Sequence, residues 1–403
     1  MRQQVDLQRT VAPGLDVRVV RDEAGFAALE EAWSELLDQS AASIFSSWQW
    51  LHPWQQRPGG SRQPFLICAR DRMTRRLHGL LPLYLEVQHG AGRRYRRLGL
   101  LGDEGVGSDH LGPLVRQGEE EKALAALTQG LLSHQEEWDL LELLDVDTDS
   151  PSTRALVEQL RSAGLGVRFE ERNECPFEPF EPGLTFERFL ARTRRADNFL
   201  RRRRWLERQP GFRIERAESS EEVQQALSSF FRLHELRWQG HSQLNTPEAQ
   251  AFHREAAARL AQRGQLRLYT LWVEGAAVAS VHALRHGGTF SYYNAGYDPA
   301  WQSKSVGLVL VGTTFQDAIA EGHREYDFLR GTEPYKLEWT TQVRRTARIQ
   351  IWRPGGPGAW VAHAERLGQQ TRRVLRSVLP ARALSALRRI RSSALRSDTR
   401  PHD

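Results

Sequence analysis

The sequence predicts a mixed α/β protein, with an α+β mixed sheet, made of two similar halves. Segments with helical spacing alternate with strand-like runs throughout, a pattern typical of mixed α/β domains. The order helix, hairpin, third strand, loop, helix, strand occurs twice, at an offset of roughly 190–200 residues, with low identity between the copies. We therefore expect tandem domains at 1–180 and 181–358, followed by a tail at 359–403.

The first half begins with an expected strand at 15–20 and a helix at 22–37. Phe26, Leu29 and Trp33 recur at helical spacing within that helix. Further along, a polar turn separates two strand-like runs and predicts a hairpin. The remaining expected elements of this half are strands at 64–70, 77–86, 95–101 and 138–144 and a helix at 119–134.

The second half repeats this order of elements. Between the halves lies an arginine-rich segment, 192–208, and after the second half a Pro/Gly break at 354–358. The expected helices are at 220–239, 247–262 and 305–321, and the expected strands are at 266–274, 276–285, 289–296, 325–329 and 346–353.

The positive charge is concentrated at the end of the chain. The formal net charge is +6, but residues 366–403 hold ten Arg and two Asp, so the rest of the chain sums to −2. A near-neutral body argues against a nucleic-acid-binding fold. Apolar residues between 384 and 395 recur at helical steps among arginines, after an interruption at Pro380. This basic helical tail is typical of an interfacial helix on an anionic membrane surface; an acidic partner protein or a disordered end are the alternatives.

The cysteines and the apolar runs indicate the cellular compartment. Cys68 and Cys175 form no CxxC or zinc spacing, and two distant thiols suit a reducing compartment. The N-terminus has no apolar signal region, and no window reaches the ~18 apolar residues of a membrane span. We expect a cytoplasmic protein without a metal, whose membrane contact would be peripheral, at the inner membrane.

The most informative segment runs from Tyr292 to Trp339. A strand ends at Gly296, and the loop 302–305 opens directly into a helix with Gly307 in its first turn. The N-terminus of a helix offers unpaired N–H groups and partial positive charge, which suit a phosphate group. The alternative is an ordinary helix capped by the side chain of Ser305. No phosphate-binding P-loop and no GxGxxG motif occurs.

The same segment carries a family resemblance. Its pattern GYDP, SxGL, AIxxG and YDFLRGxExYKxxW resembles the CelD-like (cellulose- and exopolysaccharide-associated) acyltransferases of the GNAT superfamily, which are related to the FemAB peptidyl transferases. The match covers roughly 190–355. The resemblance implies that the donor is acetyl-CoA or a longer acyl-CoA, with its pyrophosphate held by Ser303, Lys304, Ser305, Val306 and Gly307. The loop lacks the G-x-G of the more familiar acetyltransferases, so a charged-tRNA donor stays open.

Acyl transfer needs a base for the attacking group and donors for the oxyanion. Glu333 follows a predicted strand and is a candidate base, unless it only pairs with Lys336 or Arg330. His282, in mid-strand, could also be the base, with a core histidine as the alternative. Asp327 could be buried and perturbed or form a structural hydrogen bond. Tyr335 could donate a proton to a leaving thiolate.

The candidate substrate-binding residues surround the same segment. His234, Arg237 and Trp238 lie at i, i+3 and i+4 and so share one helix face; a half-exposed packing face is the alternative. Tyr297 and Lys336 complete the set. In the first half, we interpret Asp109–His110 as a loop contact at the domain junction, because no GxSxG motif accompanies it.

Three functions compete on this evidence. The first is an acyl-CoA-dependent N- or O-acyltransferase acting on a polysaccharide precursor, a sugar or a lipid amine such as a sphingoid base. The second is a degenerate GNAT fold that serves as an accessory subunit of exopolysaccharide or cellulose biosynthesis. The third, a nucleic-acid binder, is disfavoured by the neutral body.

Overall fold

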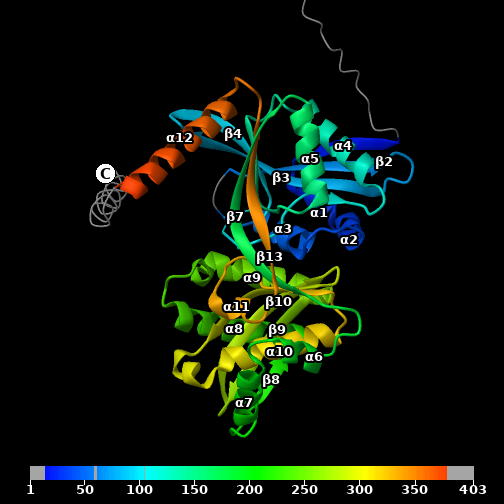
Figure 1. Cartoon of the computed structure of the whole chain (residues 1–403). Helices are drawn as coiled ribbons and strands as arrows, with labels where there is room; N and C mark the ends of the chain where they lie inside the picture. Colours follow the sequence, from blue (N-terminus) through cyan, green and yellow to red (C-terminus); the bar gives the residue numbers. More distant parts are fainter. Residues whose placement is uncertain (1–13, 59–60, 104, 379–403) are drawn as a thin grey trace, which may run out of the picture.

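The computed structural model describes residues 14–58, 61–103 and 105–378. Within these ranges, thirteen strands form one mixed sheet, in the order β1-β2-β3-β4-β6-β13-β7-β12-β11-β10-β9-β8, with β5 paired to β3. Figure 1 shows two lobes joined by the long strands β7 and β13. The predicted mixed α/β fold class is confirmed.

The first lobe contains the elements that precede residue 163. Its strands are β1 Leu15–Val20, β2 Gln63–Asp71, β3 Leu77–Gly90, β4 Arg93–Leu100, β5 Leu114–Val115 and β6 Leu140–Asp147. Its helices are α1 Glu23–Ala27, α2 Glu30–Asp38, η1 Ile44–Ser46, α3 Trp48–Gln55, α4 Glu120–Ser133 and α5 Pro151–Ser162.

The second lobe repeats the arrangement. Its strands are β8 Arg213–Arg216, β9 Leu266–Val273, β10 Ala276–His286, β11 Thr289–Tyr297 and β12 Glu325–Asp327. Its helices are α6 Phe186–Arg192, α7 Ala196–Leu206, α8 Ser220–Trp238, η2 Gln243–Asn245, α9 Pro247–Gln262, η3 Pro299–Lys304, α10 Val306–Ala320 and α11 Pro334–Leu337.

Each lobe gives its last strand to the other lobe. Strand β7 (Gly166–Pro179) leaves the first lobe and pairs with β12, while β13 (Gln342–Trp352) returns from the second lobe and pairs with β6. The two exchanged strands pair with each other in the middle of the sheet. The division at 180/181 stays a prediction, and the hydrogen-bonded sheet runs continuously across it.

The core has two main parts because strand side chains alternate between the faces of the sheet. Leu268 of β9 belongs to a cluster that includes α8 and α9 and extends through the first lobe. Its neighbour Tyr269 belongs to a second cluster with α6, α7 and α10. The face covered by α8 and α9 is therefore packed against the first lobe.

Several elements differ from the prediction. The helix expected at 22–37 is two helices, α1 and α2, and the strand expected at 325–329 ends at Asp327, since Leu329 has a left-handed φ of 57°. The last helix, α12 (Pro357–Val378), covers the start of the predicted tail. The rest of that tail, including Pro380, lies outside the described residues. No helix in the described ranges is long and apolar enough to cross a membrane.

Candidate active site

The start of α10 is open. Ser305, the residue before the helix, has a left-handed backbone (φ 58°) and its side chain makes no capping hydrogen bond. The alternative, a helix capped by the Ser305 side chain, is therefore wrong, because the left-handed backbone replaces the extended conformation of a capping serine. An added Cβ at Gly307 would meet no atom within 4 Å. Space therefore lies open beside the first turn of the helix at Gly307.

That space is a cavity of about 370 Å³. Ser305, Val306 and Gly307 line it at the helix start, and Tyr335 and Trp339 line it from the segment after β12. Ser303 and Lys304 lie outside its lining; the Lys304 ammonium lies 4.8 Å from the centre of the Trp205 ring. The predicted phosphate-binding loop therefore contributes its second part to the cavity. We call this space the donor cavity.

The cavity exists because two strands separate. β11 pairs in parallel with β12 only from Thr289 to Ser291, and beyond that point β11 continues alone on this edge. A bulge opposite His282 and Ala283 follows immediately in β11. Helix α8 lies close to β11, since a Cβ added at Gly296 would collide with the backbone of Leu233 and His234. This close approach brings Arg237 into the donor cavity.

A second cavity of about 350 Å³, here called the acceptor cavity, adjoins the first. Arg237 and Tyr292 line both cavities, so the two spaces meet at these side chains. The acceptor cavity also receives residues from both lobes. Its further lining includes Asp103 and Asp109 of the first lobe and Trp238, Asn294, Arg330, Glu333 and Lys336 of the second.

Two tyrosines lie where the cavities meet. Burial raises the pKa of Tyr335, against the opposing effect of Arg237, and raises the pKa of Tyr292 well above its usual value. Both phenols therefore keep their protons near neutral pH. The Arg237 guanidinium donates to the Ala295 carbonyl (3.2 Å) and lies over the Tyr297 ring. This region of the site is rich in hydrogen-bond donors.

Glu333 and Lys336 form the ion pair that the sequence offered as an alternative. Lys336 Nζ lies 3.0 Å from Glu333 Oε2 and donates to the Arg330 carbonyl at 2.6 Å. The lysine is buried, whereas the side chain of Glu333 is 44% exposed. Glu333 therefore presents a carboxylate to the acceptor cavity while the lysine stays in the wall.

The two candidate histidines, His282 and His234, lie outside both cavities. His282 is buried among Phe230, Tyr293 and His253, and burial lowers its pKa to about 4. Burial also lowers the pKa of His234 to about 4; its Nε2 lies 2.7 Å from Ser242 Oγ. Both rings pack α8 and α9 against the sheet.

Asp327, the remaining candidate base, is paired across the lobe junction. Its Oδ2 lies 3.1 Å from His110 Nε2. Next to this pair, Arg330 Nε donates to Asp109 Oδ1 at 2.8 Å, and the Arg330 backbone N–H donates to Asp109 Oδ2 at 3.0 Å. The predicted contact of Asp109–His110 at the domain junction is confirmed. Sequence reasoning missed Tyr292, Asn294 and Arg330, for which the only signal was their place beside the loop motif.

The comparisons with known proteins agree with this geometry. Residues 192–337 match the family model described as the acetyltransferase (GNAT) domain. No curated protein matches the sequence. Among solved structures, FemX has a TM-score of 0.58 at 11% identity and is covered over 96% of its chain by 83% of this one.

Two further structures share the fold. A conserved protein of unknown function from Bacteroides thetaiotaomicron gives a TM-score of 0.54 at 14% identity, over 83% of this chain and 100% of that one. L-PGS from Bacillus licheniformis gives 0.51 at 14%, over 84% and 95%. Residues 192–337 therefore match an acetyltransferase (GNAT) domain, within a chain whose fold is similar to that of FemX.

Proposed function

We propose that the chain transfers an acyl group from acyl-CoA to an amine or hydroxyl of a polysaccharide precursor, a sugar or a lipid amine. The observation that carries this proposal is the meeting of two cavities at Arg237 and Tyr292, one of which ends at the open start of α10. A helix start suits the pyrophosphate of CoA. Beyond Ser291, the edge of β11 that has separated from β12 suits the extended pantetheine arm of CoA, whose amide groups can bind backbone groups of a strand.

The side chains at the meeting point supply the chemistry of acyl transfer. The acceptor nitrogen or oxygen attacks the thioester carbonyl, its new bond replaces the C–S bond, and the CoA thiolate leaves. Glu333 takes the proton of the attacking group, and Tyr335 donates a proton to the thiolate. The donors of Arg237 and Tyr292 stabilise the oxyanion.

Binding of the donor is tested by thermal unfolding with acetyl-CoA and with a long-chain acyl-CoA. Saturation at 100 times the Kd adds about 2.7 kcal/mol to the free energy of unfolding. Failure of every acyl-CoA to raise the Tm would contradict a CoA-dependent function and favour the accessory-subunit or tRNA-dependent alternatives. A rise with long chains alone would favour a lipid substrate.

Catalysis is tested by release of free CoA thiol in the presence of amine and sugar acceptors. Tyr335→Phe is expected to lower kcat at least tenfold while keeping the stabilisation by acyl-CoA. Tyr95→Phe is the matched control, because Tyr95 lies in the first lobe and its hydroxyl donates to Gln88. An equal kcat in both variants would remove Tyr335 from the mechanism.

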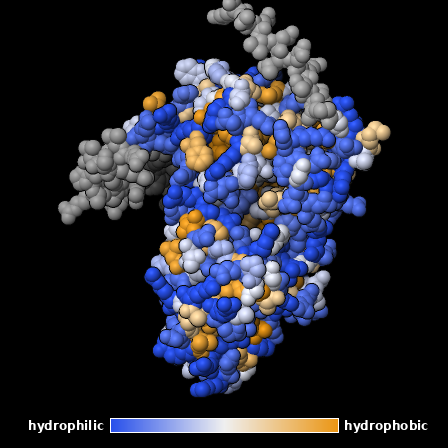
Figure 2. All heavy atoms as spheres, turned by 45° about the vertical axis from the view of Figure 1, so that its right-hand side comes forward, coloured by the Kyte–Doolittle hydropathy of each residue, from blue (hydrophilic) through white to orange (hydrophobic). Residues whose placement is uncertain are grey.

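The basic segment 366–403 remains a proposed contact with an anionic membrane surface. Helix α12 extends away from the body (Figure 1), and its side chains Trp360 and Leu367 are exposed. One face of the body itself is mostly hydrophilic, with hydrophobic residues in small separate groups (Figure 2). Cosedimentation of the full chain with anionic vesicles tests this contact.

A further inference from the structure

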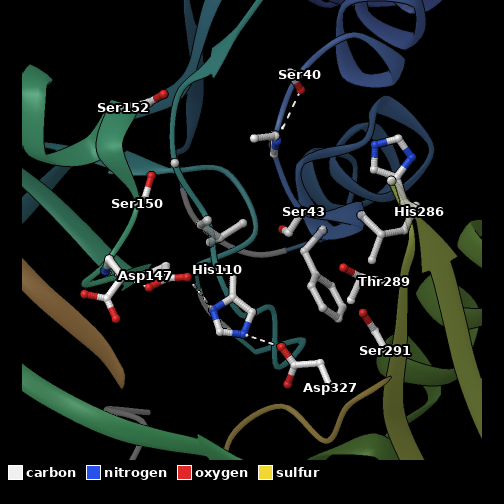
Figure 3. Close-up of a pocket in the computed structure, with 18 of the residues that line it drawn as sticks. Ser40, Ser43, His110, Asp147, Ser150, Ser152, His286, Thr289, Ser291 and Asp327 are labelled. Atoms are coloured by element: carbon white, nitrogen blue, oxygen red, sulfur yellow. Dashed lines mark hydrogen bonds and ion pairs between the residues drawn. The ribbon is translucent and has the colours of Figure 1, made fainter. Parts of the chain in front are cut away.

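A third cavity, of about 320 Å³, lies at the junction of the lobes. Its walls come from the loop 40–45 and the loop 110–113 of the first lobe, the start of α5, and the beginnings of β11 and β12 in the second lobe. Figure 3 shows side chains from all of these segments around the same space. We call it the junction cavity.

The junction cavity is distinct from the acyl-transfer site but shares a wall with it. Asp109 and Arg330 line the acceptor cavity, whereas the sequence neighbour His110 and the nearby Asp327 line the junction cavity. The Asp109–Arg330 pair thus borders the acceptor cavity, and the adjacent His110–Asp327 pair borders the junction cavity. A ligand in the junction cavity would contact both lobes without entering the place assigned to the acyl acceptor.

The charged groups of this cavity already have partners. Arg344 Nη2 lies 2.6 Å from Glu325, and its Nη1 lies 3.7 Å from Asp327. Asp327 also pairs with His110. Burial disfavours the charged imidazole, but Asp327 outweighs it and raises the pKa of His110 well above its usual value. Arg324, the exposed cation of the lining, donates to the Gly287 carbonyl. An ionic ligand that reached the buried groups would have to displace one partner of a buried pair, which is costly.

Hydroxyl groups make up much of the remaining polar lining. They belong to Ser40, Ser43, Ser150, Ser152, Thr289 and Ser291. Most of these bind neighbouring protein groups; for example, Thr289 donates to Glu325 at 2.9 Å. Ser291 differs, because it is only 5% exposed and its hydroxyl has no hydrogen-bond partner among the described residues. Figure 3 shows this hydroxyl directed into the space.

From these observations we infer that the junction cavity binds an uncharged, hydroxyl-rich ligand the size of one sugar ring. Such a ligand both donates and accepts hydrogen bonds, as the serine and threonine hydroxyls do. The carboxylates of Asp147 and Glu325 can accept from its hydroxyls, and the partly exposed Ala42 and the exposed Pro151 offer apolar surface. The volume lies at the lower end of the range for small-molecule sites. This inference does not depend on acyl transfer.

The experiment compares the thermal unfolding of the wild type and three variants. The ligands are glucose, N-acetylglucosamine, inorganic phosphate and putrescine, at about 100 mM each. Sugars at this concentration stabilise any protein by exclusion from its surface. The variants Ser291→Leu and Ser43→Leu fill the cavity from opposite walls. Ser228→Leu is the matched control, on the exposed face of α8. The signal is therefore the difference in Tm rise between proteins.

We expect at least one sugar to raise the Tm of the wild type and of Ser228→Leu by about 2 °C more than it raises that of either cavity variant. The excess should saturate with sugar concentration, and saturation-transfer NMR should show protein-to-sugar transfer that both cavity variants lose. Equal rises in all four proteins would overturn the inference. So would a protein-dependent rise with phosphate or putrescine but with neither sugar. Stabilisation by acyl-CoA should be the same in all four.

Discussion

The two lobes share an order of elements but differ at the start of one helix. α4 follows β4 and precedes β6, as α10 follows β11 and precedes β12. The first turn of α4 contains Glu120 and Glu121, whereas that of α10 contains no acidic residue. The N-terminus of a helix is partly positive. In α4 the two carboxylates neutralise this charge, whereas in α10 no carboxylate does so. The start of α10 is therefore free of the acidic side chains that occupy the start of α4.

The strands beside these helices differ in the same sense. Where β11 borders two open cavities, β4 carries Arg97, which is 1% exposed. Its guanidinium binds Glu142 (2.6 Å), Asp103 (2.7 Å) and Glu86 (2.9 Å). Asp103 in turn lines the acceptor cavity of the other lobe. The comparison teaches that, of two lobes with the same order of elements, one can border open cavities while the other fills the corresponding place with a buried ion network.

The largest expected effect comes from breaking the ion network of the first lobe. Arg97→Met removes one buried cation from three carboxylates, of which Glu142 keeps Arg348. We expect a loss of about 3–5 kcal/mol in the free energy of unfolding, measured by urea denaturation. Arg96→Met is the control, since Arg96 is partly exposed and pairs mainly with Asp139. Equal small losses in both variants would mean that the network does not hold the lobe.

Gly307→Glu transfers the acidic first turn of α4 to α10. The added side chain has room, so the fold should persist, but its charge should weaken the binding of acyl-CoA at least tenfold, or about 1.4 kcal/mol. Isothermal titration measures the Kd. Glu120→Gln in α4 should leave it unchanged; an unchanged Kd in Gly307→Glu would instead separate the helix start from the donor.

The pair that joins the lobes, His110 and Asp327, predicts a pH dependence. The folded pKa of His110 is raised above 6.5, so its contribution is fully present below about pH 6.5 and is lost as the pH rises through the folded value. The lowered pKa of Asp327 makes its contribution present above about pH 4 and lost as the pH falls. Asp147, Cys175 and Arg344 also face the pair.

We therefore expect the stability difference between the wild type and His110→Gln to be largest between about pH 4 and 6.5 and to shrink above it. Urea midpoints across this range measure the difference. His241→Gln serves as control, because His241 is exposed. A difference that grows with pH would show that the imidazole is neutral in the folded protein.

The smallest effect is expected at the centre of the sheet, where the lobes exchange strands. Arg345 is 52% exposed and pairs with Glu174 and Glu171 on β7. Arg345→Ala should change the free energy of unfolding by less than about 1 kcal/mol, as is usual for exposed pairs. Arg344→Ala should cost more. Arg344 lies on the opposite face of the sheet from Arg345, is largely buried and binds Glu325. Similar losses would contradict this division between faces.

Much of the fold followed from local patterns. Apolar spacing and caps placed β1 and α9 with the bounds that the structure has, and α8 and α10 within one residue at each end. In contrast, β7 was missed, because most of its side chains are not buried and its sequence, GVRFEERNECPFEP, shows no regular apolar alternation. The helices α5, α6 and α7 were missed or left as a charged segment for lack of a strong apolar pattern.

The site was only partly predictable. The loop before α10 identified the helix start, since that signal is local in sequence. His282 is buried between Phe230 of α8 and His253 of α9, a packing that the sequence does not reveal. Likewise, Asp109 and Arg330 meet only because the lobes pack together, 221 positions apart. Contacts that depend on register or on packing between lobes could not be derived from spacing alone.

The exchange of β7 and β13 has a consequence for biosynthesis. Asp147 at the end of β6 pairs with Thr346 of β13, 199 positions further along the chain. During synthesis from the N-terminus, the edge of β6 that pairs with β13 stays without its partner until residue 346 and the rest of β13 have been made. Contacts this distant in sequence also slow folding. The nascent first lobe is thus an open-edged intermediate, which a chaperone can shield until translation supplies its missing neighbour.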